Sequence, residues 1–152
     1  MRITQEADYA IRICATLAQT KHAVGSPQLS EQLSIPTRFT SKILRKLLLA
    51  GLVKSIRGVN GGFTFAVEPE TVTLRCIIET IDGPIAIRHC LLDEYNCSYQ
   101  KDKGKCRFHC MFEELNRIIM SRLEIFTLAD MIDVGLSAHE MIKRFDTTQK
   151  NS

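Results

Sequence analysis

The stretch from Cys90 to Cys110 constrains the fold of this chain more than any other segment. It holds four of the six cysteines and one of the four histidines of the whole sequence. Its middle, residues 98–105, is polar and charged and contains Gly104, so a packed helix or strand does not account for the sulfur atoms. Unreactive cysteines behave as small buried hydrophobes, and a polar loop offers no such surroundings. This clustering predicts a metal or iron–sulfur site.

The remaining composition is that of an ordinary globular protein. A length of 152 residues is enough for one domain, or for a small domain with an arm. The first eight residues lack the apolar core of a signal peptide, and no apolar run is long enough to cross a bilayer. We therefore expect a cytoplasmic protein without a membrane partner, in which clustered cysteines serve as ligands or sensors and not as disulfides.

Charge is unevenly distributed along the chain. Residues 1–67 contain nine Lys and Arg but three Asp and Glu, a net charge of +6. Residues 68–152 contain eleven Lys and Arg and fourteen Asp and Glu, a net charge of −3. A basic first half is what a surface that binds phosphate groups requires.

Three helices are expected in this basic half. Thr4 is expected to cap the first, whose apolar stripe is Ala7, Ala10, Ile11, Cys14, Leu17 and Ala18. Ser26 as cap and Pro27 begin a short second helix, and Thr37 caps a third that ends at Gly51. The third is expected to bury Ile43, Leu44, Leu47 and Leu48 and to leave its basic face outward. Two helices joined by a short turn in this way predict a helix-turn-helix.

Residues 52–57 and 63–67 alternate as strands do, around a glycine-rich turn, Gly58-Val59-Asn60-Gly61-Gly62. This pattern predicts a β-hairpin. With the helices it forms a winged helix-turn-helix domain over residues 1–68, whose third helix would read the major groove while the wing contacts phosphates or the minor groove. The expected DNA-contact residues are Ser26, Gln28, Arg38, Thr40, Ser41, Lys42, Arg45, Lys54, Arg57 and Asn60.

Residues 69–89 predict a connecting helix that ends at Asp82-Gly83-Pro84, with Cys76 in the core, as we also expect for Cys14. After the loop at residues 90–110, residues 107–145 predict a long helix, to about Phe126, and short helices capped by Thr127 and Ser137. The long helix has an apolar stripe that no further domain covers, which indicates a homodimer on a palindromic operator in double-stranded DNA. The expected fold is mainly α with a small β-hairpin.

The spacing of the loop cysteines bears on the kind of metal. Cys90, Cys97 and Cys106 are separated by six and eight residues, whereas zinc sites favour cysteine pairs two to four residues apart. Close spacing occurs only at Cys106, His109 and Cys110, so a zinc site stays an alternative. The wider gaps suit an iron–sulfur cluster, whose irons need sulfurs from several directions.

Several motifs together resemble the Rrf2 family of winged-helix regulators, whose members include an iron–sulfur cluster regulator and a nitric-oxide-sensing repressor. They are the opening from Met1 to Ala18, Ser30-Glu31-Gln32-Leu33, the hairpin from Gly51 to Phe63, Ile81-Asp82-Gly83-Pro84-Ile85, the three spaced cysteines and Thr127-Leu128-Ala129-Asp130. The resemblance implies that Cys90, Cys97 and Cys106 hold an iron–sulfur cluster. The family usually has five residues in each gap, so this chain departs from its pattern.

The resemblance leaves three candidates for the fourth ligand. His109 stands where the iron–sulfur cluster regulator has its ligand, and Asp8 matches the place from which a nitric-oxide-sensing relative donates a carboxylate across the dimer. Cys110 is the third candidate, since thiolate is the commonest cluster ligand. We favour a 4Fe–4S over a 2Fe–2S cluster because three cysteines and Asp8 resemble the set of the nitric-oxide sensor.

The expected function is that of a transcriptional regulator, a repressor, which senses redox state, nitric oxide or iron and cluster status. Neither a Ser/His/Asp arrangement nor a convergent pair of carboxylates is visible, so we do not expect an enzyme. The alternatives are a DNA-binding regulator that senses oxidants through zinc-bound or metal-free thiols, and a small iron–sulfur electron carrier, which would not need the basic helix and wing.

Overall fold

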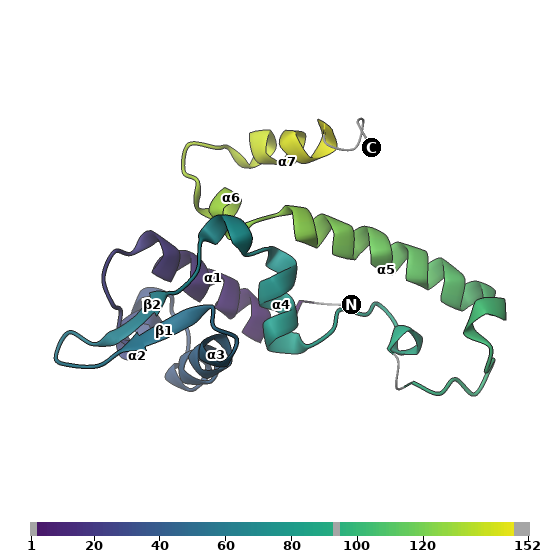
Figure 1. Cartoon of the computed structure of the whole chain (residues 1–152), viewed down its shortest axis with the longest axis horizontal. Helices are drawn as coiled ribbons and strands as arrows, with labels where there is room; N and C mark the ends of the chain where they lie inside the picture. Colours follow the sequence, from purple (N-terminus) through teal and green to yellow (C-terminus); the bar gives the residue numbers. More distant parts are fainter. Residues whose placement is uncertain (1–2, 93–94, 148–152) are drawn as a thin grey trace.

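The computed structural model describes residues 3–92 and 95–147, which form a helical head with a β-hairpin at one end and a long helical arm at the other (Figure 1). The fold is mainly helical with a two-stranded antiparallel hairpin, as predicted. The head contains α1 (Gln5–Gln19), α2 (Ser26–Gln32), α3 (Thr37–Leu49), β1 (Val53–Ile56), β2 (Gly62–Phe65) and α4 (Leu74–Asp82). The arm is α5 (Arg107–Ile125), and α6 (Leu128–Ile132) and α7 (Ala138–Thr147) follow it.

Helix α1 is the centre of the head and contacts α3, α4, α6 and β2. The Thr4 side chain caps it, because the N–H of Ala7 donates to Thr4 Oγ1 at 3.1 Å. Cys14 is completely buried on this helix, as predicted, and burial raises the pKa of its thiol to about 12. Cys14 is therefore an inert part of the core.

Helices α2 and α3 form the predicted helix-turn-helix, with Ser34 at the turn in the left-handed region at φ 53°. Two predicted caps are wrong. The cap positions are occupied by Gly25 and Pro36, and Ser26 and Thr37 are the first helical residues. The predicted burial of Leu48 is also wrong: it is 41% exposed, because it follows the fully buried Leu47 and so points about 100° away around the helix.

The β-hairpin pairs Val53 with Phe65 and Ile56 with Gly62. Its second strand is also bonded to the segment between α1 and α2, where Val24 and Phe63 exchange two backbone hydrogen bonds of 2.9 Å. A Cβ atom at Gly62 would lie 2.6 Å from the carbonyl carbon of Val24. The absence of a side chain at Gly62 therefore allows this close approach.

Helix α4 buries Ile77, Ile78 and Ile81 and ends at Gly83, which has a φ of 81°. The prediction that Cys76 is a core residue is wrong. Cys76 is exposed, because it lies on the face of α4 opposite to those three isoleucines.

The residues before α4 are joined to those after α5 by a two-residue β-bridge between Thr73 and Thr127. The N–H of Leu74 donates to the carbonyl of Phe126 at 2.8 Å, and that of Leu128 to Val72 at 2.7 Å. Thr127 also caps α6, as predicted. The chain thus leaves the head through α4 and returns to the same place at the end of α5.

None of the helices in residues 3–92 and 95–147 combines the length and the hydrophobicity needed to cross a lipid bilayer.

Candidate functional site

Most of the predicted DNA-contact residues lie at the surface of the head. Ser26 is partly buried, and its hydroxyl oxygen is enclosed without a hydrogen-bond partner. The exposed members of the predicted set are Gln28, Arg38, Ser41, Lys42, Arg45, Lys54, Arg57 and Asn60. They come from α2, α3 and the hairpin, so one end of the head presents polar and basic side chains.

Thr40 is wrong as a DNA contact. It is 0% exposed, and its hydroxyl has no partner. The reason is its place on α3, three, four and seven residues before the buried residues Ile43, Leu44 and Leu47, so it belongs to the inward face.

A carboxylate on α1 holds two lysines of α3. Lys42 Nζ lies 2.6 Å from Glu6 Oε1, and Lys46 Nζ lies 3.3 Å from Glu6 Oε2. Lys46 also donates to the carbonyl of Ile81, at the end of α4, at 2.6 Å. The hydrogen bond from Lys42, followed by that from Lys46, lowers the pKa of Glu6 against the opposing effect of burial. Glu6 therefore fixes α3 against α1 and sets the position of the Lys42 ammonium.

The tip of the hairpin stands clear of the head. Val59 is fully exposed there, between the exposed residues Arg57 and Asn60. A Cβ at Gly61 would lie 2.5 Å from the carbonyl oxygen of Ile56, so the tight turn needs a glycine at this position. The turn thus presents one cationic and one amide side chain on a short projecting wing.

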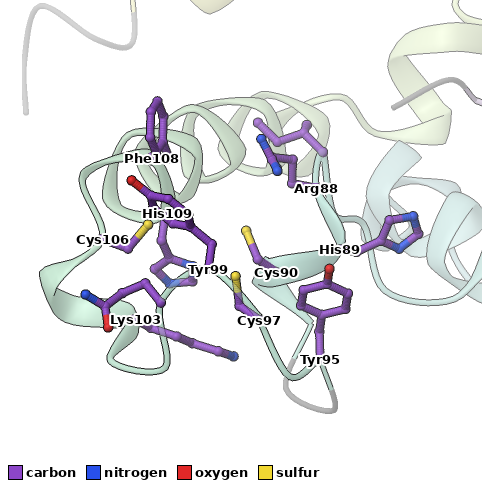
Figure 2. Close-up of a pocket in the computed structure, with 12 residues that line it drawn as sticks. Arg88, His89, Cys90, Tyr95, Cys97, Tyr99, Lys103, Cys106, Phe108 and His109 are labelled. Carbon is purple, nitrogen blue, oxygen red and sulfur yellow. The ribbon is translucent and has the colours of Figure 1, made fainter.

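Three thiols and one imidazole line a cavity of about 410 Å³ between the loop and the start of α5. These groups belong to Cys90, Cys97, Cys106 and His109. In Figure 2 the three sulfur atoms turn toward the same hollow, and the His109 ring lies between Cys106 and Cys97. The loop therefore brings together donors from both of its ends.

Local contacts explain how a polar loop closes on this cavity. Lys103 Nζ donates to the carbonyl of Leu92 at 3.3 Å, which joins the two sides of the loop. Asp102 accepts from the N–H of Gly104 at 3.1 Å and caps a short turn at Lys103–Lys105. Cys106 then occupies the N-cap position of α5. Its side chain thus stands at the N-terminal end of a long helix.

The electrostatic surroundings of Cys97 favour the thiolate form of this side chain. Backbone N–H groups of Gln100 and then Tyr99 donate to the Cys97 sulfur and lower the pKa of this thiol, and the charge of Arg88 adds to the effect. Lys103 is a second cation in the cavity lining. Such an environment suits groups that bind metal only in the deprotonated form.

His109 is the enclosed polar group of this site. It is 9% exposed, and its Nδ1 is buried without a hydrogen-bond partner. An imidazole nitrogen left unpaired in this way is costly unless another group binds it. The residues present thus fit a group that takes three sulfurs and one nitrogen.

The other two candidate ligands lie elsewhere. Cys110 is exposed, and its sulfur points to the carbonyl of Gly104 at 3.6 Å and not into the cavity. Asp8 is paired with Arg12 at 2.8 Å on α1 and is not among the lining residues of its own chain. In residues 3–92 and 95–147 no three His, Cys, Asp or Glu side chains are arranged to hold one metal ion.

Sequence reasoning missed the residues that shape the cavity. Two aromatic contacts form part of its lining, His89 stacked on Tyr95 and Tyr99 edge-on to Phe108, both with ring centroids 6.2 Å apart. It also missed Asn116, a buried polar residue of α5. The signal for Asn116 was available, because an asparagine interrupts an otherwise apolar helical stripe.

Comparison with known proteins agrees with this architecture. Residues 3–134 match the model of the Rrf2 family, described as an iron-dependent transcriptional regulator. An rrf2-like HTH-type transcriptional regulator of Rhodobacter capsulatus is 31% identical over 148 residues, which cover 93% of this chain and 99% of the relative. The HTH-type transcriptional regulator NsrR of Shouchella clausii is 27% identical over 134 residues, or 87% and 89% of the two chains.

Two solved structures share the fold. CymR, the global cysteine regulator of B. subtilis, has a TM-score of 0.68 at 23% identity, over 87% of this chain and 96% of CymR. IscR of T. potens has a TM-score of 0.68 at 23% identity, over 90% and 89% of the two chains. The winged head, the match over residues 3–134 and the likeness to these regulators lead to one conclusion: the chain belongs to the Rrf2 family of helix-turn-helix DNA-binding transcriptional regulators, and not to a family of enzymes.

Proposed function

We propose that this chain is a transcriptional repressor whose operator binding depends on an iron–sulfur cluster held by Cys90, Cys97 and Cys106. The observation that carries the proposal is the cavity that these three thiols line together with the His109 side chain. The gaps of six and eight residues between the three cysteines suit a group with several metal atoms better than a single zinc.

We propose His109 as the fourth ligand. It already lines the cavity, and binding at Nδ1 would remove the cost of an unpaired buried nitrogen. Asp8 of a partner subunit is the alternative, and it would have to leave its pair with Arg12. Cys110 is disfavoured, because its sulfur lies against loop carbonyls outside the cavity.

The surrounding side chains would hold and tune this group. Arg88 and Lys103 would offset the negative charge of bound thiolates, and the rings of Tyr99 and Phe108 form one side of the cavity. When bound, the cluster would supply irons that react with oxidants or nitric oxide. The head would bind the operator through the exposed residues of α3 and the wing.

We also propose that the protein acts as a homodimer through α5. Four apolar side chains of this helix, Phe108, Met111, Leu115 and Ile118, are between 44% and 58% exposed. A twofold dimer places two heads on one duplex, which suits a palindromic operator.

Anaerobic purification tests the cluster. We expect brown protein containing iron and acid-labile sulfide, and a Mössbauer spectrum then distinguishes a 4Fe–4S from a 2Fe–2S cluster. Cys90→Ser should lose most of the iron, whereas the matched variant Cys110→Ser should retain it. Colourless wild-type protein, with zinc or without metal, would instead support regulation through thiols alone.

The fourth ligand is tested on the same preparation. His109→Ala should change the visible circular dichroism of the bound cluster, and Asp8→Ala should leave it unchanged. The reverse result would assign the ligand to Asp8 of the partner subunit.

A further inference from the structure

Asn116 is a buried polar side chain two helical turns after His109 on α5. It is 9% exposed, yet every polar atom of its amide is used. Its Oδ1 accepts from the N–H of Ile87 at 3.0 Å, and its Nδ2 donates to the carbonyl of Ile85 at 3.2 Å and to Met120 Sδ at 3.0 Å.

These bonds give the loop the partner that a neighbouring strand would otherwise supply. An extended segment has N–H and carbonyl groups that must be paired when they are buried. Residues 85–87 lie between the end of α4 and the first cysteine, outside any strand. The Asn116 carboxamide pairs the N–H of Ile87 and the carbonyl of Ile85, and so fixes this segment beside one turn of α5.

A second contact repeats the attachment one turn closer to the cavity. The guanidinium of Arg88 lies over the ring of Phe112, 5.0 Å from its centroid. Because His109, Phe112 and Asn116 are three and four residues apart, they share one face of α5. The incoming chain therefore follows this face in the direction of His109.

We propose that Asn116 is a positioning residue that fixes where Cys90 stands relative to His109 and Cys106. From Asn116 back to His109 the helix rises about 10.5 Å. Only three residues lead from Ile87 to Cys90, and Cys90 lies in a short 3-10 turn at His89–Leu91, so they cover less than the roughly 10 Å of an extended chain. A bond from Asn116 to Ile87 thus limits how far Cys90 can move along α5, and Cys90 lines the same cavity as His109. The inference rests on the proposed function in taking this cavity as the cluster site.

Three variants test whether Asn116 positions the loop or only stabilises the arm. Leucine has a similar volume but neither donor nor acceptor, so Asn116→Leu releases Ile85 and Ile87 while α5 stays apolar on this face. Asn116→Asp keeps the acceptor for Ile87 and loses the donor for Ile85. Glu113→Leu, at an exposed position of α5, is the matched control.

The first measurement uses the metal-free protein. In Asn116→Leu we expect the Ile87 amide to exchange with deuterium about tenfold faster, and Cys90 to be alkylated by iodoacetamide several-fold faster. The exposed Cys110 should react at an unchanged rate in every variant and serves as the internal reference. Unchanged alkylation of Cys90 would overturn the proposal, whatever the wild-type protein binds.

The second measurement uses the full-length protein purified without oxygen. A bound cluster should be lost to a chelator about 10-fold or more faster in Asn116→Leu than in the wild type, as for other residues that orient metal ligands. Wild-type kinetics and an unchanged visible spectrum in this variant would overturn the proposal. If Asn116→Leu fails to fold, Asn116→Asp replaces it and should show the same changes at smaller size. If the wild type holds no cluster, the proposed function fails, and the alkylation of Cys90 still decides the role of Asn116.

Discussion

The hydroxyl of Thr40 is enclosed in the first turn of α3 without a hydrogen-bond partner. A buried unpaired hydroxyl costs roughly 1–3 kcal/mol, and valine has nearly the same shape without this cost. Thr40→Val should therefore raise the free energy of unfolding by about 1 kcal/mol in urea denaturation. The affinity for duplex DNA should not change.

Ser41→Val is the control for this experiment, because Ser41 is the adjacent exposed residue of the same helix. It should leave the stability nearly unchanged. A loss of DNA affinity in folded Thr40→Val would show that Thr40 contacts DNA after all.

Glu6 makes the stability of the head depend on pH. Its two lysine partners lower the pKa of its carboxyl group in the folded state. The stabilisation is therefore complete above the unfolded pKa, near 4.5, and is lost as the pH falls through the lower folded value. Glu6→Gln should cost about 1 kcal/mol of unfolding free energy at pH 6 and much less at pH 3.

Urea titrations at the two pH values measure this difference, with Glu31→Gln, an exposed carboxylate of α2, as control. An equal loss at both pH values would mean that packing, and not charge, makes Glu6 stabilising.

Single residues were the hardest part to predict from sequence. Cys14 could be assigned to the core because it falls on a regular apolar stripe. Thr40 and Cys76 were assigned wrongly, because the type of each side chain is the opposite of what its position favours: a polar threonine lies on the inward face of α3, and a cysteine lies on the outward face of α4. The partner of Glu6 depends on contacts between distant parts of the chain, which periodicity does not contain.

At the scale of elements, the wing depends on one close backbone approach. A side chain at Gly62 would collide with the Val24 carbonyl group, and Gly62 also has a φ of 156°. Gly62→Ala should lower the free energy of unfolding by about 2 kcal/mol and weaken DNA binding, because the wing must move away from Val24.

Gly25→Ala is the matched control, since the added Cβ would lie 3.7 Å from Pro27, at ordinary contact distance. Thermal unfolding and a titration with duplex DNA measure the two effects. Equal stability of the two variants would show that the bridge between Val24 and Phe63 is not essential to the wing.

The elements themselves were predictable because their signals are local. Apolar spacing and the glycine-rich turn located the helices and the hairpin, and the first residue of α5 was correct. The path of the loop was not predictable. It is determined by Asn116 and Lys103, which bond to backbone groups 29 and 11 residues away along the chain.

At the scale of the whole molecule, the exposed apolar face of α5 carries the proposed dimer. Leu115→Glu places a charge at the middle of this face and should convert the protein to a monomer in analytical ultracentrifugation. Operator affinity should fall by about 100-fold or more, because each head then binds alone.

Glu113→Lys changes the charge of an exposed residue on the same helix and should leave the dimer intact. A Leu115→Glu protein that remains dimeric would show that the subunits associate through another surface.

The β-bridge between Thr73 and Thr127 has a consequence for how such a chain tolerates insertions and deletions. Because residues 74–126 depart from and return to one fixed point, a change of length between Cys90 and Cys106 is absorbed inside a closed excursion. The head and the C-terminal helices need not shift to accommodate it. The fold can therefore accommodate gaps of six and eight residues between the three cysteines. For the same reason, residues 74–126 are a natural unit to graft onto another winged head.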